Sequence, residues 1–232
     1  MSGSTISIKS HDGKSFDGYL ALPPLGHGPG LIVIQEIWGV NAHIRAVAEQ
    51  YALDGYVVLA PDVFWRQEPG VDLNYDEAGT KKAYALMQGL NGPDAVADLV
   101  ASAQALRARS EVTGQVGVVG YCMGGRLAYQ LAATGAVDAA VCYYGGGIQN
   151  HLELASAIQV PMLFHYAELD THIPETAVSA VQAAFNGRSN AHVHVYEGAE
   201  HGFNCWGRPM YQQRTAALGR GRTLQWLSSH LD

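Results

Sequence analysis

A glycine-flanked turn between a strand and a helix constrains the fold of this chain most. Residues 116–119, Val-Gly-Val-Val, are apolar as in a buried strand, and Gly-Tyr-Cys-Met-Gly-Gly follows at 120–125. Glycine fits at Gly120 and Gly124 because a Cβ at either position would clash with the neighbouring strand or helix. The stretch therefore predicts a tight strand-to-helix turn that raises the side chain of Cys122 above a sheet.

This turn has the form of a nucleophile elbow, with sulfur in place of the usual serine oxygen. Cys122 would lie at a helix N-terminus, where free N–H groups and the helix dipole favour a thiolate. The N–H groups of Ile37, which follows an earlier strand, and of Met123 are the predicted oxyanion donors. The alternative is a buried structural cysteine, because free cysteine often behaves as a small hydrophobic residue.

Composition limits the classes of protein that remain. With 232 residues, of which 48% are hydrophobic and 15% charged, the chain has the size and the core of a single domain over residues 1–232. A net charge of −7 at pH 7 disfavours nucleic acid as a partner, and no apolar run is long enough to cross a membrane. Three cysteines without a secretory segment predict reduced thiols in the cytoplasm. We expect a monomer or a small homo-oligomer.

Short apolar runs alternate with amphipathic stretches along the chain. This alternation predicts an α/β fold with a mostly parallel central sheet and helices on both faces. Asn41 is expected to cap the first helix, because its side chain can accept a free N–H there. A hairpin is predicted from 6–9 and 18–22, further strands at 31–34, 56–60, 116–119, 139–144, 162–165 and 192–196, and helices between Asn41 and Asp54, at 75–89, at 94–108, after the elbow, at 175–185, and near the end with Leu224, Leu227 and Leu231.

A cysteine nucleophile needs a base to take its proton and an acid to orient that base. Chains with such an elbow supply them in the order nucleophile, acid, histidine. Asp170 follows a predicted strand and His201 follows the last one, so both lie at the edge where ligand sites of open α/β sheets collect. We therefore predict a catalytic triad of Cys122, Asp170 and His201. Glu168 is the competing acid, and a buried ion-paired aspartate with a capping histidine is the structural alternative.

Glu36 follows the first buried strand directly, where a carboxylate is unusual unless it has a partner. A carboxylate near Cys122 would disfavour the thiolate, so we expect Glu36 to hold that thiol protonated at rest. The structural alternative for Glu36 is an ion pair with Arg45 or Arg126.

Other patterns are rejected. His192 and His194 share one face of a strand, but a third ligand at suitable spacing is missing, so ordinary alternation is favoured and no metal is expected. His151-x-Glu153 after a cysteine elbow resembles glutamine amidotransferases, but His151 follows the elbow cysteine by only 29 residues (151 − 122). Cys142 lies in an apolar strand and is assigned to the core. Neither a Gly-x-Gly-x-x-Gly stretch nor a Walker loop occurs, so we expect no cofactor.

Four segments together resemble the dienelactone hydrolase (carboxymethylenebutenolidase) family. They are Gln-Glu-Ile-Trp-Gly at 35–39, Ala-Pro-Asp-Val-Phe at 60–64, the elbow at 120–125 and Glu-His-Gly-Phe at 200–203. The likeness runs from about residue 5 to residue 230. It implies a single α/β-hydrolase domain with a triad at Cys122, Asp170 and His201, a resting-state partner at Glu36 and an oxyanion hole from Ile37 and Met123.

The resemblance also implies a reaction. The family opens the ring of an unsaturated lactone that bears a carboxylate, during the breakdown of catechols. Substrate binding would free the thiol from Glu36, the thiolate of Cys122 would attack the ester carbonyl, and the enolate would leave. His201 would then activate the water that hydrolyses the acyl-enzyme. We therefore expect a small lactone or ester as the partner molecule.

The positions for substrate recognition depart from the family pattern. Members that cleave dienelactones grip the substrate carboxylate with two arginines, and these positions correspond here to Thr80 and Cys205. Lys81, Lys82 or Arg208 are the candidate substitutes, although lysine lacks the planar two-pronged geometry of arginine.

Two alternatives to a dienelactone hydrolase stay open. One is a broad short-chain carboxylesterase that has lost selectivity for a carboxylate. The other is a non-enzymatic thiol sensor on a hydrolase fold, with Cys122 as the oxidisable group. Tyr84 matches a tyrosine of the family pocket, whereas Met87 stands where an aromatic residue is common. The predicted substrate-binding residues are Tyr84, Trp38, Phe203 and Lys81, with Tyr121 and Tyr144 as further pocket walls.

Overall fold

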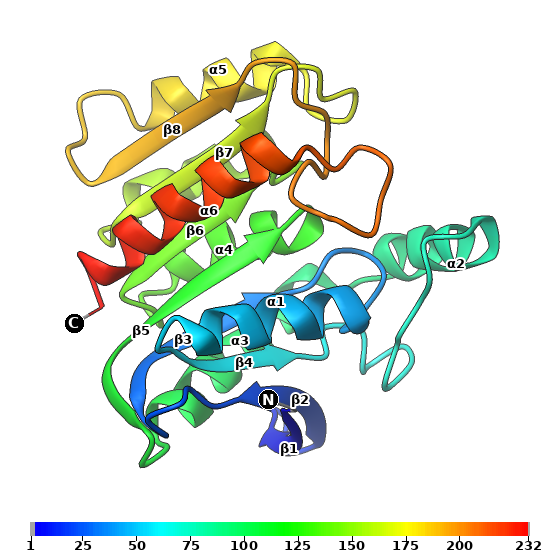
Figure 1. The fold of residues 1–232 in the computed structure, drawn as a ribbon, viewed down its shortest axis with the longest axis vertical. Helices are drawn as coiled ribbons and strands as arrows, with labels where there is room; N and C mark the ends of the chain where they lie inside the picture. The colour runs from blue at the N-terminus through cyan, green and yellow to red at the C-terminus, as the bar shows by residue number, and fades with distance from the viewer. Residues whose placement is uncertain (1–2, 232) are drawn as a thin grey trace.

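The strands of the described residues form a single sheet in the order β1-β2-β4-β3-β5-β6-β7-β8 (Figure 1). The computed structural model describes residues 3–231, so residues 1–2 and 232 of the predicted domain lie outside it. β2 pairs antiparallel with β1 and β4, and every other neighbouring pair is parallel. The prediction of a mostly parallel α/β sheet is confirmed. The strands are β1 Ser4–Lys9, β2 Ser15–Ala21, β3 Gly28–Ile34, β4 Val57–Pro61, β5 Val112–Tyr121, β6 Ala139–Tyr143, β7 Met162–Ala167 and β8 Ala191–Tyr196.

Helices cover both faces of the sheet. Figure 1 shows α1 and α6 in front of the strands and α3 and α4 behind them, while α2 projects from the rest of the molecule. Both faces of the central strands are therefore dry, and the side chains at 31–34 and 57–60 are all buried. The helices are α1 Ala42–Leu53, α2 Glu77–Gln88, α3 Gly92–Arg107, α4 Met123–Ala133, the 3₁₀ segment η1 Ile148–Ser156, α5 Glu175–Ala184 and α6 Gln213–Ser228.

The helix α1 begins as its sequence predicts. The Asn41 side chain accepts a hydrogen bond from the Ile44 N–H at 3.1 Å and thereby caps the first turn. The face toward the sheet is buried and includes Ile44, Val47 and Tyr51, together with His43. His43 therefore lies inside the protein, at the start of α1.

The turn between β5 and α4 is as tight as its glycines indicate. A Cβ on Gly120 would lie 1.9 Å from the carbonyl oxygen of Gly124, and one on Gly124 would lie 2.5 Å from that of Ile34. Cys122 itself has φ 55° and ψ −117°, a conformation rare for a residue with a side chain. Helix α4 begins at the next residue, so the sulfur stands at the end of the strand beside a helix N-terminus.

Two segments differ from the predictions. The strand expected at 139–144 ends at Tyr143, because Tyr144 has φ 35° and leaves the extended conformation. The 3₁₀ segment η1 was not predicted, because it follows a glycine run and breaks at His151, where φ is −135°. The terminal helix was expected to carry Leu231, but α6 ends at Ser228, and Leu231 lies beyond it, fully buried.

Among the helices of residues 3–231, none combines the length and the apolar character needed to cross a bilayer.

Candidate active site

Three side chains predicted to act together meet at the carboxyl edge of the sheet. The β5–α4 turn carries Cys122, the loop after β7 carries Asp170, and the loop after β8 carries His201. His201 Nε2 lies 3.2 Å from Cys122 Sγ, and His201 Nδ1 lies 2.7 Å from Asp170 Oδ2. One imidazole ring therefore joins a sulfur to a carboxylate through its two nitrogens.

Asp170 is oriented by the loop that carries it. Its Oδ1 accepts hydrogen bonds from the backbone N–H groups of His172, at 2.8 Å, and Ile173, at 3.0 Å. The other oxygen is left to face His201. Glu168, the competing acid, is exposed and accepts the N–H of Gly198 at 2.8 Å, so the geometry selects Asp170 as the partner of the histidine.

The surroundings of His201 favour its protonated form. Burial of the ring opposes protonation, but hydrogen bonds and charge from Asp170 and Cys122 outweigh burial and raise the pKa of His201 to about 10. A protonated ring 3.2 Å from the sulfur stabilises a thiolate on Cys122. The site is thus suited to an imidazolium–thiolate pair.

The two predicted oxyanion donors lie beside the sulfur. Ile37 and Met123 line the same pocket as Cys122. Within residues 3–231, neither backbone N–H donates a hydrogen bond to the protein, whereas the N–H of Cys122 is taken by the carbonyl oxygen of Tyr143 at 3.0 Å. Both N–H groups are therefore available to an oxygen above Cys122.

The pocket over Cys122 has a volume of about 320 Å³. Trp38, Tyr84 and Met87 form its less polar walls, and the guanidinium groups of Arg126 and Arg208 add positive charge. Pockets of this size hold small organic molecules and are typically apolar with a few polar groups.

Phe203, predicted to bind substrate, is instead part of the core. It is fully buried, and its ring lies 5.3 Å from that of Tyr144 and 5.2 Å from that of Tyr196. Tyr121, also predicted as a wall, is buried too, and its hydroxyl lies 3.1 Å from that of Tyr51. These rings do not line the pocket because they turn inward from the ends of the strands and from the histidine loop.

Lys81 also does not line the pocket. It is exposed on α2, about one turn before Tyr84, and α2 projects from the rest of the molecule (Figure 1). Lys82 is paired with Glu68 at 2.6 Å. The lysines considered as substitutes for arginine therefore point to solvent or to an acid.

Arg208 supplies the charge that these lysines do not. Its Cζ lies 4.6 Å from the centre of the Trp38 ring, and its Nη1 lies 3.6 Å from Glu36 Oε1. Thr80 accepts the Trp38 indole N–H at 3.4 Å, and Cys205 donates to the hydroxyl of Tyr75 at 3.3 Å. The two positions that hold arginine in the family are thus occupied by short polar side chains.

Glu36 is buried and faces Arg208. Burial raises the pKa of this carboxyl, and the charge of Arg208 acts against that rise. The alternative ion pairs with Arg45 and Arg126 are wrong: Arg45 pairs with Asp72 at 2.9 Å, and the cation beside Glu36 is Arg208.

The predicted resting contact between Glu36 and the nucleophile is not the arrangement seen. Cys122 Sγ is hydrogen-bonded to His201, and within the described residues no hydrogen bond joins it to Glu36. The reason is that His201, itself held by Asp170, already occupies the hydrogen-bonding position beside the sulfur.

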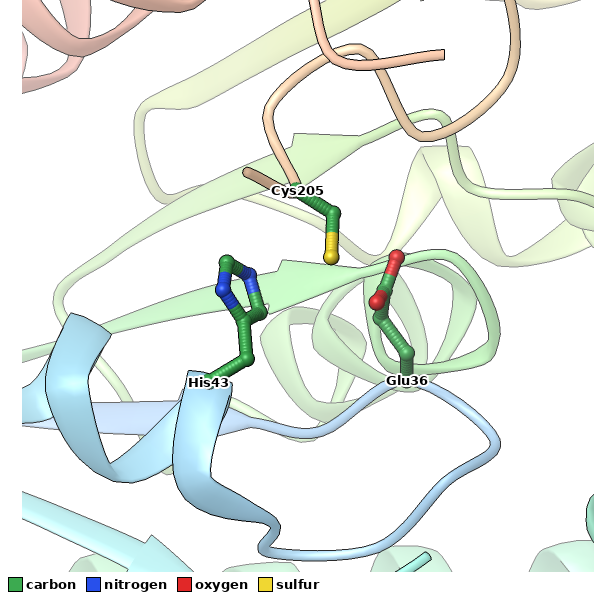
Figure 2. Close-up of side chains that lie close together, drawn as sticks. All are labelled: Glu36, His43 and Cys205. Carbon is green, nitrogen blue, oxygen red and sulfur yellow. The ribbon is translucent and has the colours of Figure 1, made fainter. Parts of the chain in front are cut away.

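One group of possible metal ligands lies beside the pocket. Glu36, His43 and Cys205 bring ligand atoms within 4.8 Å of one another (Figure 2). The sequence analysis missed it, because Cys205 was considered only as a replaced arginine and His43 was not considered. The rejected pair packs elsewhere, with His192 edge-on to Trp226 at 5.0 Å.

Comparisons with known proteins identify the family of this chain. The family model described as "Dienelactone hydrolase family" matches residues 16–231. The chain belongs to the dienelactone hydrolase family. The resemblance inferred from four short segments is confirmed over nearly the whole sequence.

Individual members of the family are similar over their full lengths. A carboxymethylenebutenolidase of Pseudomonas putida is 36% identical over 224 residues, which are 96% of this chain and 95% of that protein. Carboxymethylenebutenolidase 1 of Cupriavidus pinatubonensis is 32% identical over 224 residues, again 96% and 95% of the two chains. The crystal structure of a proposed dienelactone hydrolase from Klebsiella pneumoniae superposes with a TM-score of 0.85 at 27% identity, covering 97% of this chain and 98% of that one. This member of the family is therefore a hydrolase of carboxylic esters with an α/β-hydrolase fold.

Proposed function

We propose that this dienelactone hydrolase homologue opens a small lactone, or cleaves a small ester, through an acyl-enzyme on Cys122. The supporting observation is the continuous hydrogen-bonded path from Cys122 Sγ through His201 to Asp170, with distances of 3.2 and 2.7 Å, at the floor of a pocket. Nucleophile, base and orienting acid at such separations are what acyl transfer requires.

In the first half of the reaction the thiolate of Cys122 attacks the carbonyl carbon and forms a C–S bond. The N–H groups of Ile37 and Met123 donate to the oxygen that becomes negative. The C–O bond of the ester then breaks, and the leaving oxygen takes the proton of the His201 imidazolium. In a lactone the leaving enolate stays attached to the acyl group.

In the second half, neutral His201 removes a proton from water. The resulting hydroxide attacks the thioester carbonyl, the C–S bond breaks, and the thiolate of Cys122 is regenerated beside a protonated ring. Asp170 holds the ring in the orientation that serves both steps. Glu36, whose oxygens make no hydrogen bond to Cys122 among the described residues, enters the proposal only as a buried carboxylate near the pocket whose charge would disfavour the thiolate.

The charge of the pocket favours an anionic substrate. Arg208 and Arg126 both line the cavity, and a guanidinium can bind a carboxylate with two parallel hydrogen bonds. The aromatic faces of Trp38 and Tyr84 suit a flat unsaturated ring. A lactone that carries a carboxylate fits both features, whereas a neutral ester uses only the second.

A broad carboxylesterase is the second candidate, favoured by Thr80 and Cys205 at the positions that carry arginine in the family. Hydrolysis of an unsaturated carboxylate-bearing lactone and of its neutral methyl ester, at matched concentrations, distinguishes the two functions. We expect kcat/KM to favour the anion. A large preference for the neutral ester would contradict the dienelactone proposal and leave the esterase.

The nucleophile is tested separately by trapping. Acid quenching during turnover should give a mass increase equal to the acyl group on the peptide that contains Cys122, and Cys122→Ala should give neither adduct nor product. Full activity in Cys122→Ala would overturn the mechanism. The thiol sensor predicts no turnover by the wild-type protein. Because the reaction needs a free thiol, we place it in a reducing compartment, the cytoplasm.

A further inference from the structure

Three separate segments deliver metal-binding side chains to one buried point behind the pocket. Glu36 follows β3, His43 lies in the first turn of α1, and Cys205 lies in the loop between β8 and α6. Their ligand atoms all lie within 4.8 Å of one another, and the residues are 1%, 6% and 0% exposed. Figure 2 shows the Cys205 sulfur pointing into the space between the imidazole ring and the carboxylate.

The polar atoms around this point have unmet hydrogen-bonding capacity. Among the described residues, both carboxylate oxygens of Glu36, Nδ1 of His43 and Nη1 of Arg208 are buried without a hydrogen-bond partner. Buried polar atoms in folded proteins are almost always paired. The carboxylate and the imidazole nitrogen are therefore free to bind a ligand beside the Cys205 sulfur.

We propose that Glu36, His43 and Cys205 form a binding site for a thiolate-preferring divalent metal ion such as Zn²⁺. A donor set of one sulfur, one imidazole nitrogen and one carboxylate oxygen is a zinc set, whereas Mg²⁺ and Ca²⁺ prefer oxygen ligands alone. Zinc binds these donors at about 2.0–2.3 Å, so ligand atoms of a tetrahedral site are separated by roughly 3.5 Å. The side chains need to shift by about an ångström to close around the ion.

Metal binding releases one proton from the protein. The S–H bond of Cys205 breaks, a metal–sulfur bond forms, and the proton passes to solvent. The Cys205 thiol now donates to Tyr75 at 3.3 Å, so the phenol or a water can complete the fourth position. Arg208, 3.6 Å from Glu36, is repelled by the ion, and the face of Trp38 offers its guanidinium a position in the pocket.

This site would regulate the hydrolase that we propose above. The metal would fix Glu36 and tie the loop that carries His201 to the start of α1, so we expect occupancy to inhibit turnover. The inhibition depends on the proposed function, but the binding does not. Binding is therefore measured directly.

The experiment is a titration of the metal-free protein with Co²⁺, whose bond to a thiolate gives a charge-transfer absorption. We expect one equivalent to bind and the band to persist in Cys122→Ser. Cys205→Ser should abolish the band, and His43→Gln should weaken binding by at least tenfold. Zn²⁺ should displace Co²⁺ and abolish the charge-transfer band in the wild-type protein, a readout that needs no variant.

The opposite pattern overturns the proposal. A band lost in Cys122→Ser and retained in Cys205→Ser would place the metal on the nucleophile and His201. No band with the wild-type protein would also refute the site. Hydrolysis by the metal-free wild-type protein is measured in parallel, so that failure of the metal site and failure of the hydrolase function are distinguished.

Discussion

Two neighbouring groups of buried polar side chains differ in how well they are paired. In the triad, both ring nitrogens of His201 and both oxygens of Asp170 have hydrogen-bond partners. In the group behind it, Glu36 and His43 are also buried, but among the described residues the Glu36 oxygens accept no hydrogen bond, and the ion pair of Glu36 with Arg208 spans 3.6 Å. The paired group is preorganised for one reaction, whereas the unpaired group is able to respond to a ligand.

The largest effect that would sharpen this comparison comes from Cys122→Ala. We expect kcat/KM to fall by about 10⁴–10⁶-fold, because the nucleophile of a preorganised triad is removed. Steady-state kinetics with an activated ester measure it. Cys142→Ala, in a core strand away from the site, is the matched control and should leave kcat/KM within a few-fold of wild type.

The next effect comes from Asp170→Asn, which we expect to lower kcat by roughly 10³–10⁴-fold, since an amide neither orients the imidazole correctly nor stabilises its positive charge.

The same pair affects the stability of the fold. The pKa of His201 is raised from 6.5 to about 10 in the folded protein. Its contribution to stability is therefore complete below pH 6.5 and is lost as the pH rises through 10.

Urea denaturation at several pH values checks the stability part of this prediction. The wild-type protein should lose unfolding free energy between pH 6.5 and 10, and Asp170→Asn should lose clearly less. An identical slope in both proteins would mean that Asp170 does not set the protonation of His201.

The Arg208→Ala variant tests whether Arg208, the cation beside Glu36, binds the carboxylate of the substrate. We expect KM for a carboxylate-bearing lactone to rise by about 10–100-fold, as for the loss of a charged hydrogen bond, with little change for the neutral ester. Arg45→Ala is the control, because Arg45 pairs with Asp72 outside the pocket. Equal effects on both substrates would show that Arg208 acts by packing on Trp38 instead.

The smallest effect is expected for Glu36→Gln. If Glu36 keeps the thiol protonated at rest, the amide should raise the alkylation rate of Cys122 several-fold in the absence of substrate. Mass spectrometry after timed exposure to iodoacetamide measures this rate. A slower reaction would indicate that Glu36 instead activates the thiol.

The strands, the elbow and the grouping of Cys122, Asp170 and His201 followed from the sequence. Glycines at 120 and 124 are needed wherever a strand turns this sharply into a helix, and chain order then locates Asp170 and His201. The distinction between Asp170 and Glu168 becomes clear only in three dimensions. It depends on which carboxylate accepts the N–H groups of the next turn.

The pocket lining was harder to predict because irregular loops build it. The segment after His201 has no periodicity, so nothing in the sequence indicates that Phe203 turns into the core or that Arg208 turns back over Trp38. Likewise, helical periodicity does not show which residues of α2 line the pocket. Tyr84 and Met87 do so and Lys81 does not, so the prediction that Lys81 binds substrate was wrong.

The positive φ of Cys122 has a consequence for the chemistry open to this scaffold. At φ 55° and ψ −117° a β-branched side chain such as threonine or valine would crowd its own backbone. Serine has the same unbranched shape as cysteine, so among nucleophilic side chains serine is the replacement that this bend accommodates most readily. The acidity and softness of the attacking atom can thus change while the surrounding frame stays as it is.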